Sequence, residues 1–79
     1  GPQSLWAFST TTEDVAIRNN LYQRLGPSET LRRLAARFPG GSAKAEVERR
    51  RRNVEDQSDA DGEVVNVILE IANEIAREL

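Results

Sequence analysis

Apolar residues recur at helical spacing along much of the chain, and the widest apolar face lies in residues 63–79. On a helical wheel, the apolar side chains of this segment cover roughly 200°. We expect a helix that either lies at the centre of a small bundle or docks onto a partner, because so wide a face needs cover on more than one side. The β-branched start of the segment also fits a strand, as a less favoured alternative. The interaction residues predicted in this helix are Val64, Ile68, Ile71, Ile75 and Leu79.

Three further helices are predicted upstream, over about residues 13–25, 29–38 and 43–53. The first two carry apolar stripes, whereas the third is poorly amphipathic and is expected to be unstable in isolation. Residues 55–62 are acidic and polar and are predicted to form a linker. Glycine and proline mark the helix ends, and hydroxyl side chains of capping type precede the helix starts. These signals are Thr10 or Thr11, Gly26-Pro27, Ser28, Pro39-Gly40-Gly41 and Ser42.

The N-terminal part of the chain is short and aromatic. Residues 5–9, Leu-Trp-Ala-Phe-Ser, fit a strand in which Trp6 and Phe8 would share one face. They would pack against the first helices or, without a neighbouring strand, form an exposed adhesive edge. Residues 1–4 are interpreted as disordered or as a scar left by removal of an expression tag. The predicted fold is therefore mainly α, a small bundle of three to four helices with a short N-terminal extended segment, in which residues 5–54 form the helical region.

The composition excludes several kinds of chemistry. The chain of 79 residues contains neither cysteine nor histidine, which removes disulfides, the commonest general base and the commonest zinc ligand. No run of 18 apolar residues and no signal-peptide pattern is present, so we expect a soluble, cytoplasmic protein without membrane insertion. No cofactor is predicted, and an enzyme is the remotest of the functional classes.

Charge is distributed unevenly along the chain. Residues 1–54 hold ten Lys/Arg against five Asp/Glu, a net charge of +5, whereas residues 55–79 hold one arginine against eight acids, a net charge of −7. The two parts should attract each other or oppositely charged partners. The sequence pI of about 5.1 argues against a dedicated nucleic-acid-binding protein.

The densest charge run is Arg49-Arg50-Arg51-Arg52. On a helix these four side chains spread around the whole circumference, so a solvated or ion-paired surface is the favoured interpretation. The expected local partners are Glu46, Glu48, Glu55 and Asp56. A docking surface for an acidic protein or for nucleic acid is the alternative, although no aromatic stacking platform accompanies the run.

Two short motifs resemble ligand-binding loops but lack the residues that such loops need. In Gly40-Gly41-Ser42-Ala43-Lys44 the lysine follows alanine and the glycine spacing of a phosphate-binding P-loop is missing. A helix break followed by a cap is the favoured interpretation, with weak anion binding at the next helix as the alternative. Asp59-Ala60-Asp61-Gly62 resembles part of a calcium loop, but glutamine and isoleucine stand at two ligand positions.

Several stretches within about residues 5–54 form a combined pattern: Leu5 to Thr11, Glu13 to Ala16, Arg18, Leu21-Tyr22, Leu31 to Ala35 and Arg37 to Lys44. Taken together, they resemble the C-terminal end of the large traffic ATPases of type IVB secretion and related conjugation systems. This RecA-like family includes the IcmB/DotO-like and TraU-like proteins. The resemblance implies that residues 5–9 are the last strand of a nucleotide-binding sheet and that the helices are an appendage to it. It also implies that the catalytic residues lie upstream, in a parent that works at the cytoplasmic face of a bacterial inner membrane.

Two functions follow as hypotheses. In the first, the chain is a non-catalytic module that docks to a protein partner or to a neighbouring subunit of such an ATPase, which includes homo-oligomers. In the second, it is a small helical regulator that binds nucleic acid through its arginines. The acidic tail discriminates between them, because it would compete with phosphate for the basic half of the chain.

Overall fold

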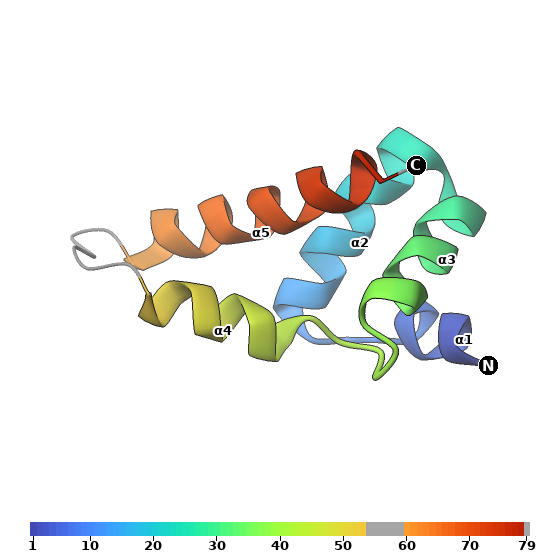
Figure 1. The fold of residues 1–79 in the computed structure, drawn as a ribbon, viewed down its shortest axis with the longest axis horizontal. Coiled ribbons are helices and arrows are strands. Elements are labelled where there is room, and N and C mark those ends of the chain that lie inside the picture. Colours follow the sequence, from blue (N-terminus) through green and yellow to red (C-terminus); the bar gives the residue numbers. More distant parts are fainter. Residues whose placement is uncertain (54–59, 79) are drawn as a thin grey trace.

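The computed structural model describes residues 1–53 and 60–78, and five α-helices make up most of this part of the chain (Figure 1). The mainly α fold predicted from the sequence is confirmed, and no strand occurs among the described residues. The helices are α1 (Pro2–Ala7), α2 (Thr12–Leu25), α3 (Pro27–Arg37), α4 (Lys44–Arg52) and α5 (Ala60–Ala76).

The prediction of an extended N-terminal segment is wrong, because this segment forms helix α1. Pro2 occupies the first turn, where its missing N–H costs no hydrogen bond, and Gly1 is the N-cap. A single strand would leave its backbone groups without a neighbouring strand, whereas the helix bonds many of them internally. Residues 2–4, interpreted as disordered or as a scar, belong to this helix, and α1 raises the helix number above the predicted three to four.

The other predicted helices are confirmed, with small shifts at their ends. The N-cap of α3 is Gly26, at φ 82°, with Pro27 at the first helical position, so the prediction that Ser28 caps this helix is wrong. Helix α5 already begins at Ala60, so residues 60–62 belong to the helix and not to the predicted linker. Residues 55–59 of the predicted linker lie outside the described residues.

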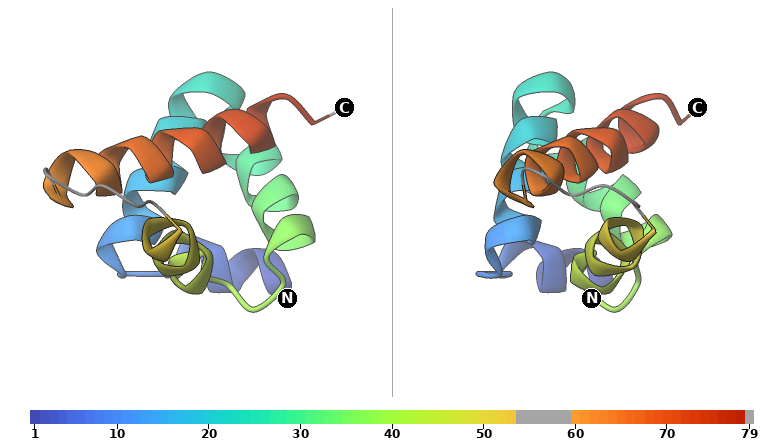
Figure 2. Two further views of the ribbon diagram at one scale, coloured as in Figure 1. Left: turned by 60° about the vertical axis from the view of Figure 1, so that its left-hand side comes forward. Right: turned by 90° about the vertical axis from the view of Figure 1, so that its left-hand side faces the viewer.

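Helix α2 lies at the centre of the packing and contacts α3, α4 and α5. Helix α1 packs against α3, and α4 runs beside α5 (Figures 1 and 2). The α4–α5 pair extends to one side of α2, which accounts for a long axis of 38 Å against 21 and 19 Å for the other two. The buried apolar residues are Trp6, Ile17, Leu21, Leu34, Ala35, Ala43, Val47, Val67, Ile68, Ile71, Ala72 and Ile75.

Candidate interaction surfaces

The apolar face of α5 forms part of the hydrophobic core. Ile68, Ile71 and Ile75 are 9%, 1% and 0% exposed, and Val64 is partly buried against the same core. The predicted face is therefore covered by the other helices of the same chain, which was one of the options that its width left open. Leu79, the last residue predicted for this surface, lies outside the described residues.

Trp6 also belongs to the core and does not lie on an exposed edge. Its side chain is fully buried, and its indole Nε1 donates a hydrogen bond to the carbonyl oxygen of Phe38 at 2.9 Å. The two aromatic rings lie 6.1 Å apart between centroids, tilted by 55°, a favourable arrangement. Trp6 thus anchors α1 to the end of α3.

Among the described residues, the large apolar side chains that remain exposed form two pairs. Phe8 is 82% exposed and Leu5 is 55% exposed, three residues apart at the C-terminal end of α1. Val65 and Leu69 are 54% and 41% exposed, four residues apart on α5. Residues three or four apart on a helix are neighbours on its surface. Of the residues predicted for docking that the structure describes, Phe8 is the one with a largely exposed side chain.

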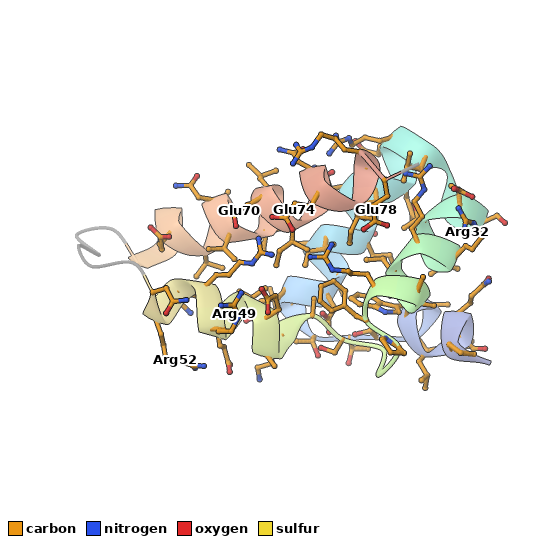
Figure 3. All side chains as sticks on the ribbon, viewed as in Figure 1. Arg32, Arg49, Arg52, Glu70, Glu74 and Glu78 are labelled. Carbon is orange, nitrogen blue, oxygen red and sulfur yellow. The ribbon has the colours of Figure 1, made fainter. Side chains whose placement is uncertain are left out.

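An ion-pair network joins α4 and α3 to α5. Arg50 donates hydrogen bonds to Glu74 at 2.6 and 3.0 Å, to Glu46 at 2.7 Å, and also to Glu70. Arg37 of α3 reaches the same Glu74 at 3.2 Å. Figure 3 shows Glu70 and Glu74 on α5 and Glu78 just beyond its end. The basic first part and the acidic last part of the chain therefore attract each other within one molecule, as their charges predicted.

The four arginines of the basic run have different surroundings. Arg49 pairs with Glu46 of its own helix at 2.6 Å, which confirms Glu46 as a local partner of the run. The pairing of Arg50 with Glu70 and Glu74 of α5 was not predicted. Hydrogen bonds from Arg49 and Arg50 lower the pKa of Glu46 to about 2. Arg51 is half-buried, and Arg52 is exposed and extends from α4 away from α5 (Figure 3). The predicted partners at positions 55 and 56 lie outside the described residues.

A buried carboxylate that sequence reasoning missed joins three segments of the chain. Asp14 is fully buried and accepts hydrogen bonds from Ser9 Oγ at 3.1 Å, from Ser42 Oγ at 2.6 Å and from the backbone N–H of Ala43 at 2.8 Å. In the sequence its position at the start of a helix was fully explained by the helix dipole. Ser9 and Ser42 lie 5 and 28 residues away from Asp14 in the sequence, and no sequence pattern indicates that they meet it.

This carboxylate occupies the position where weak anion binding was considered. Ala43 is the N-cap of α4, and its N–H points at Asp14 Oδ1, so the chain supplies its own anion at this helix start. Ser42 Oγ also accepts a hydrogen bond from the N–H of Lys44 at 3.1 Å, but the N-cap is Ala43, so the prediction that Ser42 is the cap is wrong by one residue. Gly41 has φ 89° and lies against Leu5. The glycine-rich stretch is thus a packed turn.

Two arginines bind the C-terminal ends of helices, where carbonyl groups lack partners within the helix. Arg18 of α2 donates to the carbonyl oxygens of Trp6, Ala7 and Ser9 at 2.7–3.2 Å. Arg33 of α3 donates in the same way to three carbonyl oxygens at the end of α5, again at 2.7–3.2 Å. Each arginine thereby fixes the end of one helix to the side of another.

The part of the chain that the structure describes contains neither a metal-binding cluster nor a membrane-spanning helix. No group of three or more acidic side chains among the described residues could hold a metal ion. Asp61 and Gly62, part of the calcium-like motif, lie in the helical backbone of α5, and Gln57 and Asp59 are outside the described residues. No helix in the described part of the chain has the length and apolar character needed to cross a membrane.

The chain was also compared with known proteins. No protein-family model, no curated protein and no solved structure matched it.

Proposed function

We propose that this chain is a non-catalytic protein-interaction module that docks through the exposed end of α1. The observation that supports this most directly is the exposed pair Leu5 and Phe8. Their helix is held rigidly, because Trp6 is buried beneath it and Arg18 binds its last carbonyl groups. An aromatic side chain presented on a fixed helix loses little conformational freedom on binding, as hot spots of protein interfaces require.

The parent protein is proposed to be a traffic ATPase of type IV secretion or conjugation, acting at the cytoplasmic face of the inner membrane. The resemblance over residues 5–54 supports this proposal. One implication of the resemblance has to be modified, since residues 5–7 are helical and do not form the last strand of a nucleotide-binding sheet. In the proposal, α1 is therefore a docking element in its own right, and nucleotide hydrolysis belongs to another part of the parent.

Binding of nucleic acid through the arginines is the second hypothesis, and the ion pairs count against it. Arg32, Arg33, Arg37, Arg49 and Arg50 all pair with carboxylates of the same chain. A phosphate backbone would have to displace these carboxylates. We expect fluorescence anisotropy to detect no salt-dependent binding of duplex or single-stranded DNA at 150 mM salt, and binding that weakens steeply with added salt would favour this second hypothesis instead.

Photo-crosslinking tests the docking proposal. A photoreactive phenylalanine analogue replaces Phe8 in one variant and Ala36, an exposed residue of α3, in the control. We expect an adduct of defined mass from position 8 and not from position 36. Excess unlabelled chain of unaltered sequence should suppress an adduct with a different protein, whereas excess Phe8→Ser should not. An adduct of twice the mass of the 8.8 kDa chain would identify a second copy as the partner. Equal adducts from both positions would reject docking through α1.

A further inference from the structure

Helix α4 differs from the other long helices in how it is held. Within α4, all of whose residues are described, Val47 is the one buried residue, and Ala43 at the N-cap is buried beside it. Most of its other residues are charged. Apolar burial is the main force that holds a helix in place, so α4 depends to an unusual extent on polar contacts.

Those polar contacts lie at the two ends of the helix. At the N-terminal end, Asp14 binds Ser42 and the N–H of Ala43. Toward the C-terminal end, Arg50 binds Glu70 and Glu74 of α5, with the Arg50 and Glu74 side chains 15% and 27% exposed. We call the contacts of Arg50 with Glu70 and Glu74 the ionic latch.

Val47, the buried residue of α4, belongs to the same hydrophobic core as Val67 and Ile71 of α5, which are 3% and 1% exposed. In the sequence, Val67 and Ile71 each precede a glutamate of the latch by three residues, so each lies about one helical turn from it. Undocking of α4 would therefore remove Val47 from this core and expose part of the core to water.

We propose that α4 is a hinged strap that closes against α5 over the core that contains Val47, fixed at its N-terminal end by Asp14 and held shut by the ionic latch. Salt opens the strap because it screens the latch, whereas the hydrogen-bonded junction at Asp14 keeps the N-terminal end attached. An undocked α4 frays, since a helix of nine residues is marginal on its own. This inference does not depend on the proposed function.

Hydrogen exchange measured by mass spectrometry on the full chain tests the strap. Arg50→Gln and Arg49→Gln form a matched pair, because both arginines bind Glu46 but only Arg50 also reaches α5. We expect amides in residues 47–53 to exchange at least about fivefold faster in Arg50→Gln than in the unaltered chain. In Arg49→Gln their exchange rates should stay within about twofold of those in the unaltered chain. Amides of α2 should not change.

Salt supplies an independent measurement on the unaltered chain. Raising KCl from about 0.05 to 0.5 M, which shortens the screening length from about 14 to 4 Å, should speed exchange in α4 several-fold and leave α2 unchanged. Equal effects of the two variants, or exchange in α4 that is slow and insensitive to salt, would overturn the proposal. If Arg50→Gln speeds exchange in all helices together, the salt series on the unaltered chain decides whether α4 opens separately.

Discussion

Asp14 joins three segments of the chain, because its one carboxylate binds Ser9 after α1, Ser42 in the turn before α4 and Ala43 at the start of α4. Asp14→Ala would leave the buried N–H of Ala43 without a partner and remove two further hydrogen bonds. We expect a loss of about 2–4 kcal/mol in the free energy of unfolding, measured by urea denaturation. Glu13→Ala, the neighbouring acid, should cost less than about 1 kcal/mol; equal losses would show that Asp14 acts only as a helix-start acid.

Gly41 is a second residue for which the structure makes a sharp prediction. A Cβ at this position would lie 2.7 Å from the Leu5 Cβ, and the backbone φ of 89° disfavours any side chain. Gly41→Ala should therefore destabilise the chain by about 1–3 kcal/mol. Gly40→Ala is the matched control, since a Cβ there meets nothing within 4 Å. Thermal unfolding that ranks the two variants equally would contradict this packing of α1 on the turn.

At the scale of elements, the end of α5 depends on an arginine of α3. Arg33 is 16% exposed and donates to the carbonyl oxygens of Ile75 and Ala76 in α5 and of Glu78 just beyond it. Its neighbour Arg32 is 58% exposed and pairs with Glu29 of its own helix. We expect Arg33→Ala to cost about 1–3 kcal/mol and Arg32→Ala less than about 0.5 kcal/mol. Denaturant midpoints of the two variants test this, and a larger loss for Arg32→Ala would refute the capping role.

The buried face of α5 makes a second prediction at this scale. Ile71→Asp places a charge in the core and should unfold the chain or cost more than about 4 kcal/mol. Glu70 and Asn73 of α5 are unsuitable as control positions, because Glu70 binds Arg50 and Asn73 accepts a hydrogen bond from Arg24. Exposed Asn66 is the better control, and circular dichroism of Asn66→Lys should match that of the parent. Retention of a cooperative melt by Ile71→Asp would contradict the core assignment.

Helices that carry an apolar period and stop signals could be predicted from the sequence, and those that do not were harder to define. Helices α2 and α3 combine an apolar stripe with Gly26-Pro27 between them, so local chemistry is sufficient to place them. Helix α1 has six residues, too few to show a period, and the aromatic alternation of Trp6 and Phe8 favoured a strand. Its helical state depends on packing against α3 and on the hydrogen bond from Trp6 to Phe38, 32 residues away.

The contacts of the polar network could be predicted only in part. The opposite charges of the two parts of the chain indicated attraction between them, and Glu46 was a predicted partner of the arginine run. Which acid of α5 meets Arg50, and which serines meet Asp14, depends on the tertiary arrangement of helices. Sequence spacing contains no information about such pairs when they lie about 20 or more residues apart.

For the whole molecule, the paired glutamates make stability depend on acid pH. Hydrogen bonds from arginines lower the pKa of Glu29 and of Glu46 from 4.5 to about 2, and Arg50 lowers the pKa of Glu74. These groups bind protons more readily in the unfolded chain, so their stabilisation is complete above about pH 4.5 and is lost as the pH falls toward 2.

Denaturation at several pH values tests this linkage. The unaltered chain should lose stability between about pH 4.5 and 2. Glu46→Gln has no carboxyl to protonate at position 46, so it should be less stable than the unaltered chain at pH 7 but lose less stability on acidification. Glu48→Gln, at an exposed position of the same helix, is the control and should follow the parent. An acid loss of the same size in Glu46→Gln would show that other groups cause it.

The burial of Trp6 gives the molecule an intrinsic optical probe at one defined place. It is the single tryptophan of the chain, and its indole lies between α1 and the end of α3. Its fluorescence emission should shift to longer wavelength when α1 leaves that pocket, without any label. The α4 strap lies elsewhere in the bundle, so its opening should leave this emission unchanged. Tryptophan emission and the circular dichroism of the helices should therefore follow different curves as salt is raised, and coincide only when the whole chain unfolds.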